Sequence, residues 1–455
     1  MSDYVPLWTI ELVCCALTLS VLDIARSSLP GTSARKEEIM EHTYENVAAL
    51  AGRAAGPLAS HLGPFVTLLI DQQYAASVIY IKITHALAFD RWVAKRGLVL
   101  ADLGDTHIER YQHRSRCRRQ RIRTETRRRE RFEVMQLLQF LRSRAVCPAR
   151  CVETTAADDL ATQYGQHLQD NQGLATATIE RYRTVARRFL HERFGRDKVD
   201  LRALRVGDVI AFVQHQTHCL QPPALKCVVT AMRSFLRYAQ YRGEVASSLV
   251  ASVPTVAAWT TTPAVPKAIS PEHAQRAINS CDLSTGGGLR DHAVLLLLAR
   301  LGLRAREIIE LQFEDCDWES GHLRVRSKNR RKQLLPIPVD VGAAIAAYLQ
   351  QGRPKSKDRH VFLRSMAPIR GLMPGSDAIG TIVRHALQRA KVDAPHRGSH
   401  QFRHALAVRM LQRGASLREI GEVLRHQSPQ TTSIYARVDI SALRSLAMPW
   451  PGGVR

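Results

Sequence analysis

Four side chains near the C-terminus have the types and spacing suited to chemistry on a phosphodiester. His400 and Arg403 form an H-x-x-R pair, His426 follows, and Tyr435 is the single tyrosine of this stretch. Arginine clamps phosphate oxygens with a planar, permanently charged fork, histidine exchanges protons near neutral pH, and tyrosine can attack phosphorus covalently. Each residue alone would fit an ordinary helix face, so the interpretation depends on the whole set and on two motifs upstream.

The first upstream motif is LLARLGLRAREIIELQFEDCDW, which begins at Leu297. Its first half has the apolar spacing of one buried helical stripe, and Gly302 interrupts this stripe where the backbone can turn or approach another segment closely. Arg304 and Glu307 follow three residues apart, so the carboxylate can orient the guanidinium. The alternative interpretation is an ordinary solvated ion pair.

The second upstream motif has the pattern of a β-hairpin with a cationic tip. Leu323 and Val325 alternate with arginines, and the apolar residues after the tip predict a return strand. Lys328 leads the tip, and Lys332 is the alternative lysine. A lysine here can protonate a leaving oxygen or hold a phosphate as a point charge. The competing interpretation is a charged edge that prevents aggregation.

Short helices are predicted around the C-terminal set. Ser416 and Glu419 have the S-x-x-E form of a capping box, and Gly414 stands where the preceding helix should stop. Ser428 is expected to cap a last helix that begins at Pro429, which puts the tyrosine about two turns into that helix. Cations gathered there are expected to lower the pKa of the phenol from about 10, because they favour its charged form.

The order of these motifs resembles the tyrosine recombinases, also called phage-integrase-type site-specific recombinases. GLRARE, a strand–Lys–strand hairpin, HQFRH and LRHQSPQTTSIYAR succeed one another over about residues 268–440. The resemblance implies a mainly α protein with a small antiparallel β-sheet in the catalytic domain (α+β), in which a helical SAM-like core-binding domain precedes the tyrosine-recombinase catalytic domain. Two positions depart from the family pattern: Leu301 replaces a small hydroxyl residue, and SKNRRK replaces a glycine-flanked lysine turn.

The resemblance also implies a role for each candidate residue. Tyr435 would attack the scissile phosphate, giving a 3′-phosphotyrosyl link and a free 5′-hydroxyl. Arg304 and Arg403 would hold the non-bridging oxygens and stabilise the transition state. Because the phosphotyrosine retains the energy of the broken bond, the reaction would need no ATP, and the resemblance implies no cofactor and no metal.

The remaining site residues would handle protons or orient other groups. Lys328 would protonate the leaving 5′-oxygen, with Lys332 as the alternative. His400 and His426 would assist proton transfer and phosphate binding, and Glu307 would support the first arginine.

Composition limits the partners. The 455 residues carry a net charge of +24, which favours a polyanionic partner, and the phosphate-handling motifs favour nucleic acid over a membrane surface. The nine scattered cysteines are typical of reduced thiols, and Cys147 with Cys151 lacks the second pair that a zinc site needs. The apolar stretch at 5–22 contains an acid and is a poor signal peptide or membrane span. We therefore expect a cytoplasmic, nucleoid-associated protein.

Composition and periodicity divide the chain into several parts. We expect an N-terminal arm at 1–60, whose first 39 residues either precede the true start at Met40 or are peripheral. A helical module follows at 61–150, interpreted as a first core-binding-like or an arm-binding domain. The core-binding domain is expected at 154–249, a linker at 250–267, the catalytic domain at 268–447 and a tail at 448–455. The two helical parts align as a repeat with a constant register, in which Phe89 pairs with Leu190 and Tyr111 with Phe212.

An arginine-rich segment lies between the two helical parts. In RYQHRSRCRRQRIRTETRRRER, which begins at Arg110, eleven arginines stand against two glutamates. So dense a cluster indicates contact with backbone phosphates, which positions a protein on DNA without reading its sequence. The alternative is a solvated face or flexible tail. The candidate DNA-binding residues are Arg118, Arg119, Arg121, Arg127, Arg128 and Arg129.

Together these features predict a site-specific DNA recombinase or integrase encoded by a mobile element. Its partners would be double-stranded DNA with specific recombination sites, further copies of itself (a dimer on each site and a tetramer in synapsis) and other recombinases. Two alternatives stay open: a type IB topoisomerase-like nicking–closing enzyme, and a catalytically silent DNA-binding regulator.

Overall fold

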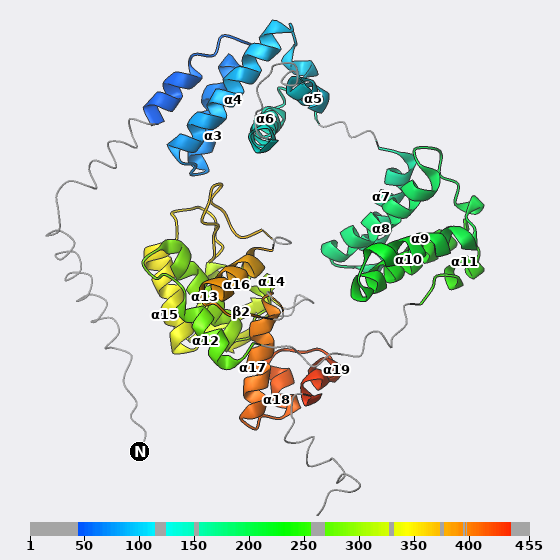
Figure 1. Cartoon of the computed structure of the whole chain (residues 1–455), viewed down its shortest axis with the longest axis vertical. Coiled ribbons are helices and arrows are strands. Elements are labelled where there is room, and N and C mark those ends of the chain that lie inside the picture. Colours follow the sequence, from blue (N-terminus) through cyan, green and yellow to red (C-terminus); the bar gives the residue numbers. More distant parts are fainter. Residues whose placement is uncertain are drawn as a thin grey trace, which may run out of the picture. The chain divides into compact units, whose positions relative to one another are not determined.

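The computed structural model describes residues 44–113, 124–149, 154–255, 269–326, 332–373, 377–394, 396 and 398–437 (Figure 1). The predictions for residues 1–39, for the hairpin tip at 327–331 and for the tail at 448–455 lie outside these ranges. Three parts of the chain each have their own buried core. No helix in the described ranges is both long enough and apolar enough to cross a membrane.

The first helical part begins earlier in the chain than predicted. A helix at 44–51 contributes Val47 and Ala51 to the core, so the module extends upstream of residue 61. The helices that follow are α3 (Ala59–Asp71), α4 (Ala76–Lys95), η1 (Leu100–Asp102), α5 (Asp105–His113) and α6 (Thr124–Ser143). Asp90 is buried in α4, and its carboxylate accepts hydrogen bonds from the backbone N–H groups of Gly56 and Leu58, which fixes the approach to α3.

The second helical part repeats the order of elements from α3 to α6 and adds one short helix at its end. Its elements are α7 (Ala156–Gln172), α8 (Thr176–Phe194), η3 (Leu201–Ala203), α9 (Val206–Cys219), α10 (Pro222–Tyr241) and α11 (Ser247–Ala251). A capping box between Thr155 and Asp158 begins α7, and Gly173 ends it with a φ of 56°. The linker prediction placed its start too early, because α11 continues to Ala251, and Leu249 and Val253 pack into the core of this part.

Buried positions recur at matching places in helices α3 to α6 of the first part and α7 to α10 of the second. For the long helices α4 and α8, however, the predicted register is wrong by one residue, since the buried Phe89 corresponds to the buried Phe189 and not to Leu190. The second part has one extra residue after α8, which restores the predicted register further along the chain. Because Phe189 and Leu190 are adjacent and both apolar, the sequence pattern alone could not distinguish the two registers. The matching buried sets are Leu62, Phe65, Val66, Leu69 with Ala161, Tyr164, Gly165, Leu168; Ile108, Tyr111 with Val209, Phe212; and Val134, Leu137, Leu138, Leu141 with Met232, Phe235, Leu236, Ala239.

The third part is built around one apolar helix and carries a small sheet. Its helices are α12 (Pro271–Asn279), α13 (Gly286–Arg300), α14 (Ala305–Ile309), η5 (Phe313–Asp315), α15 (Val339–Ala347), η6 (Tyr348–Gly352), α16 (Ala378–Arg389), α17 (His400–Gln412), α18 (Leu417–Val423), α19 (Pro429–Thr432) and η7 (Ser433–Arg437). The run of leucines in α13 is buried on all sides, with α12, α15, α16 and α17 packed around it. The hydroxyl of Ser270 caps α12 by accepting a hydrogen bond from the backbone N–H of His273.

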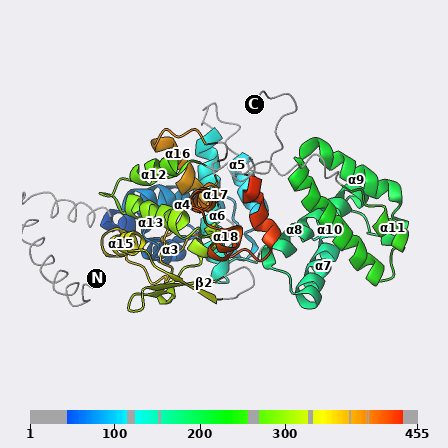
Figure 2. The same ribbon diagram turned by 90° about the horizontal axis from the view of Figure 1, so that it is seen from below.

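The sheet of the third part is the predicted hairpin with one short strand added. Strands β1 (Cys316–Asp317), β2 (His322–Arg326) and β3 (Lys332–Pro336) pair antiparallel in the order β1-β2-β3. Figure 2 shows β2 to one side of the helices of this part. Leu323 and Val325 point into the core, so the predicted alternation of apolar and charged residues is confirmed. The protein is therefore mainly α with one small antiparallel sheet.

Candidate active site

A glycine turn at the end of α13 begins the candidate site. Gly302 has a φ of 56°, and a Cβ at this position would lie 2.8 Å from Cδ2 of Leu424 and 3.0 Å from Cδ2 of Leu406. Glycine is therefore needed both for the left-handed backbone and for the close approach of α17 and the end of α18. The turn sets Arg304 at the N-cap of α14.

Arg304 and Glu307 interact as the sequence predicted. Nη1 of Arg304 donates to Oε1 of Glu307 at 2.8 Å, and the backbone N–H of Arg304 donates to Oε2 at 2.9 Å. The glutamate side chain is buried, whereas the arginine side chain is 32% exposed. Glu307 thus fixes the orientation of the Arg304 guanidinium, while part of this group remains accessible to an anion.

Arg403 comes from the first turn of α17 and is almost completely buried. Its Nη1 donates to the carbonyl of Gly302, and its Nη2 donates to the carbonyl of Leu424. Nη2 of Arg304 donates to the next carbonyl, that of Arg425, at 3.3 Å. The two guanidinium groups thus bind the carbonyls of consecutive residues, Leu424 and Arg425. Burial, together with the nearby positive charges of Arg304 and Arg425, lowers the pKa of Arg403 to about 10, which still leaves it charged at neutral pH.

A third arginine, which the sequence did not single out, completes this cluster. Arg425 has a φ of 56°, and its Nη2 donates to Oε2 of Glu307 at 2.9 Å, with both side chains buried. One carboxylate thus holds two guanidinium groups. The local sequence gives little sign of this arrangement, because an arginine rarely adopts left-handed backbone and its partner lies far away along the chain.

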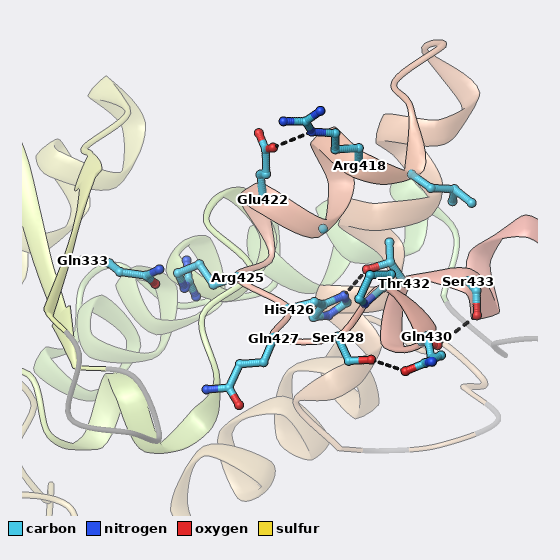
Figure 3. A pocket seen from close by; sticks show the side chains of 13 residues that line it. Gln333, Arg418, Glu422, Arg425, His426, Gln427, Ser428, Gln430, Thr432 and Ser433 are labelled. Atoms are coloured by element: carbon cyan, nitrogen blue, oxygen red, sulfur yellow. Dashed lines mark hydrogen bonds and ion pairs between the residues drawn. The ribbon is translucent and has the colours of Figure 1, made fainter.

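Tyr435 is buried in η7, where its hydroxyl is 2.7 Å from Nδ1 of His404. The ring of His426 lies parallel to the tyrosine ring, at 6.4 Å between centroids, and Nδ1 of His426 is 2.7 Å from Oγ1 of Thr432 (Figure 3). His404 was missed by the sequence analysis. The available signal was its position one turn after His400 on the same helix.

The local helix predictions around the tyrosine are confirmed in part. The capping box of Ser416 and Glu419 begins α18, and Gly414 has a φ of 86° after α17. Ser428 occupies the N-cap of α19, but its side chain makes no capping hydrogen bond and contacts Gln430 instead. The last helix is also shorter than predicted, since α19 ends at Thr432 and the tyrosine lies in the following 3₁₀ turn.

The expected lowering of the tyrosine pKa is wrong. Burial raises the pKa of Tyr435 to about 12, and the opposing charge of Arg403 is too weak to reverse this effect. Burial and neighbouring arginines also lower the pKa of His426 to about 4. The pKa of His404 is lowered by burial and then by the charges of His400 and Arg403. Desolvation and the same arginines lower the pKa of His400, although this residue at the start of α17 remains accessible.

The lysine and arginine predictions fall mostly outside the described ranges. Lys328 lies in the undescribed tip, and the alternative Lys332 is exposed at the start of β3, where it pairs in register with Arg326. Among the candidate DNA-binding arginines, Arg128 and Arg129 are exposed on α6, and Nε of Arg129 is 3.1 Å from Glu133. The other four candidate arginines have side chains that the structure does not describe: Arg118, Arg119, Arg121 and Arg127.

A cavity of about 1270 Å³ opens beside the arginine cluster. Arg425, His426 and Thr432 line one part of it, and Gln333 of β3 faces them from the hairpin (Figure 3). Within the described ranges, no group of three or more His, Cys, Asp or Glu side chains is suited to hold a metal ion. The arrangement is therefore one of fixed cations and neutral imidazoles beside a phenol.

Comparison with known proteins assigns the family. The model of the phage integrase family matches residues 267–441. The putative integrase/recombinase y4rA of Sinorhizobium fredii is 43% identical over 408 residues, which cover 89% of this chain and 97% of that protein. The tyrosine recombinase XerD of Listeria innocua is 25% identical over 286 residues, covering 62% of this chain and 94% of XerD.

A solved structure shares the fold. It is the post-cleavage complex of the XerH site-specific recombinase with a palindromic difH substrate, which covers 64% of this chain and 84% of that one with a TM-score of 0.51 and 17% identity. The fold class predicted from the sequence is confirmed. The chain belongs to the phage integrase family, and it is a site-specific tyrosine recombinase, an enzyme that transfers DNA strands.

Proposed function

We propose that Tyr435 is the nucleophile and that Arg304 and Arg403 bind the non-bridging oxygens of the scissile phosphate. The observation that carries this proposal is the binding of both guanidinium groups to the consecutive carbonyls of Leu424 and Arg425, directly before His426, whose ring is parallel to that of the tyrosine. Fixed cations stabilise the charge that develops on phosphate oxygens without having to reorganise during the reaction. The product is a 3′-phosphotyrosyl link, whose retained bond energy allows religation without ATP.

The leaving 5′-oxygen needs a proton, and we assign its delivery to Lys328, with Lys332 as the alternative. The support is the β2–β3 hairpin, which carries a lysine at or next to its tip, and the exposure of Lys332 at the start of β3. An ammonium on a hairpin can reach a substrate bound in front of the sheet. His400 and His426 assist as neutral hydrogen-bonding groups, since their pKa values lie below the ordinary value.

The two helical parts are proposed to be DNA-binding modules of one common type. Their shared order of helices and matching buried positions support a duplication. In the second module, α8 carries exposed arginines that include Arg181, Arg187 and Arg188. In the first module, α6 carries the exposed arginines Arg128 and Arg129. We expect these arginines to contact backbone phosphates and to position the protein rather than read base sequence.

The DNA partner is proposed to be a specific, two-fold symmetric recombination site. The support is the palindromic substrate of XerH, because a palindrome is matched by a protein dimer. Two such sites would be paired by a tetramer, and other recombinases could take part in that assembly. A mobile element is the proposed origin of the gene, in keeping with the integrase/recombinase name of y4rA. We assign the protein to the cytoplasm, in association with the nucleoid.

The test uses a nicked suicide duplex that carries the proposed recombination site. Cleavage releases a short strand and traps a covalent protein–DNA adduct, which is seen on a denaturing gel. We expect an adduct with the natural chain and none with Tyr435→Phe, although that variant should still bind the duplex. An adduct with Tyr435→Phe would overturn the choice of nucleophile.

A second assay separates recombination from the alternative functions. Two differently labelled sites on separate duplexes are incubated with the protein, and a supercoiled plasmid that carries one site is treated in parallel. Joined products from the two duplexes support strand exchange. Relaxation of the plasmid without joined products would support a topoisomerase-like enzyme, and absence of any adduct would support a DNA-binding regulator.

A further inference from the structure

The proposed reaction leaves one proton without an acceptor. A phenol whose pKa is raised to about 12 keeps its proton at neutral pH, so Tyr435 cannot wait in the site as a phenolate. Attack on phosphorus must therefore transfer this proton to another group. Lys328 serves the leaving oxygen and the arginines are cations with no basic lone pair, so the acceptor must be one of the nearby histidines.

We propose that His404 is a further catalytic residue, which accepts the proton of the Tyr435 hydroxyl through Nδ1 as the tyrosine attacks the phosphate. This proposal rests on the proposed role of Tyr435 as nucleophile. Its direct support is the distance of 2.7 Å between Nδ1 and Oη, which lies within the reach required of a general base. Nδ1 can accept this proton when the neutral imidazole carries its own hydrogen on Nε2.

The other groups around the hydroxyl are less suited to this task. Nδ1 of His426 is hydrogen-bonded to Thr432, and the centroid of its ring is 6.4 Å from that of the tyrosine ring. His400 is accessible at the start of α17, and its ring centroid is 6.3 Å from that of His404. Arg403 and Arg304 carry fixed positive charges. Within the described residues, His404 is thus the base that is already in hydrogen-bond contact with Oη.

The surroundings favour a neutral imidazole before attack. Burial, followed by electrostatic repulsion from His400, Arg403 and His396, lowers the pKa of His404, so its imidazole is uncharged at neutral pH. The same surroundings make the imidazolium that forms during attack a stronger acid than that of an ordinary histidine. It is therefore ready to return its proton to Oη during religation, as a freely reversible strand transfer requires.

The proposed step is balanced in both directions. In cleavage the Oη–P bond forms, the hydroxyl proton moves to Nδ1 of His404, the P–O5′ bond breaks, and O5′ takes a proton from the lysine of the hairpin. In religation O5′ gives its proton back and attacks phosphorus, the Oη–P bond breaks, and the imidazolium returns its proton to the tyrosine. No oxidant, metal or nucleotide is needed.

The test compares His404→Asn with His404→Ala and with the natural chain. The amide of asparagine stands near the position of Nδ1 and can still hydrogen-bond the hydroxyl, but it cannot take up a proton. Single-turnover formation of the covalent adduct is measured from pH 5 to pH 9 on the nicked suicide duplex, together with DNA binding and thermal unfolding of each variant.

A base at this position predicts a specific result. The natural chain should lose activity only at a pH below the ordinary titration range of histidine, where the imidazole of His404, whose pKa is lowered, becomes protonated. His404→Asn and His404→Ala should both react about 10²–10⁴-fold more slowly at neutral pH, which is the range for loss of a general base. Their rates should rise with pH up to 9, because the phenol must ionise unaided, while DNA binding by His404→Asn is unchanged.

A substrate with sulfur in place of the bridging 5′-oxygen shows whether a variant is defective in taking the proton from the tyrosine or in protonating the leaving group. A thiolate leaves without a proton, so this substrate should rescue Lys328→Ala but not His404→Asn. Three outcomes would overturn the proposal: near-normal cleavage by His404→Asn, an unchanged pH profile in this variant, or rescue of it by the sulfur substrate. Any of these would leave the proposed function intact. That function fails separately if Tyr435→Phe still forms an adduct.

Discussion

Arg304 and Arg425 are held by the two oxygens of a single carboxylate. Oε1 of Glu307 accepts from Nη1 of Arg304 at 2.8 Å, and Oε2 accepts from Nη2 of Arg425 at 2.9 Å. The sharing matters because the glutamate and Arg425 are both removed from solvent, where an unpaired charge is costly. Glu307 therefore neutralises part of a cluster of three arginines and fixes the orientation of the one that remains partly exposed.

Glu307→Gln should therefore weaken the fold as well as the site. Removing the charge leaves the Arg425 guanidinium buried without its counter-ion, and we expect a loss of about 3–5 kcal/mol in the free energy of unfolding. Urea denaturation measures this loss. The matched control is Glu310→Gln, since Glu310 pairs with the exposed Arg306, and loss of such a surface pair should cost about 0–1 kcal/mol. Equal losses in both variants would show that the shared carboxylate has no special importance.

Arg425→Gly tests the same pair from the other side. Glycine relieves the left-handed backbone at this position, which costs an ordinary residue about 1–2 kcal/mol, but it also removes the buried ion pair. In the natural chain we expect the lost pair to outweigh the relieved backbone. In the Glu307→Gln background the pair is already absent, so the same substitution should be neutral or stabilising. The double-mutant cycle measures this coupling, and strictly additive effects would contradict it.

Arg403→Ala should reduce the rate of adduct formation about 10²–10³-fold, equivalent to about 2.7–4 kcal/mol of transition-state stabilisation. Arg403→Lys should not restore the rate, because one ammonium cannot reproduce a planar fork that binds the carbonyls of Gly302 and Leu424 at once. Single-turnover cleavage at saturating protein separates this effect from DNA affinity. Recovery to near the natural rate with lysine would mean that charge alone is required.

The histidines near the tyrosine make stability depend on pH. The pKa of His426 is about 4 in the folded protein and about 6.5 in the unfolded chain, so the unfolded chain binds more protons between these values. The free energy of unfolding should thus be unaffected by His426 above pH 6.5 and should decrease as the pH drops towards 4. His426→Gln should flatten this dependence when unfolding is measured at several pH values. A profile identical to that of the natural chain would exclude His426 as a contributor.

The sequence predicted the interactions that form within a few residues of the chain. The pair of Arg304 with Glu307, the capping box of Ser416 and the alternation in β2 depend on local spacing, which the sequence displays directly. The placement of Arg425 and the bond between His404 and Tyr435 depend on how distant helices meet, and no periodicity encodes this. The tyrosine pKa was predicted in the wrong direction, because charge can be counted in a sequence but burial cannot.

The salt dependence of DNA binding tests the role assigned to the first helical module. Arg128 lies exposed on α6, and each phosphate contact that it makes should release counterions from the duplex. Arg128→Gln should reduce the slope of log affinity against log salt by about 0.9 per lost contact. Arg128→Lys keeps the charge and should keep the slope, which makes it the matched control. Titration of labelled duplex at several salt concentrations gives the slopes. If the glutamine and lysine variants share the natural slope, Arg128 makes no phosphate contact, and the DNA-binding surface of this module must be sought on another face.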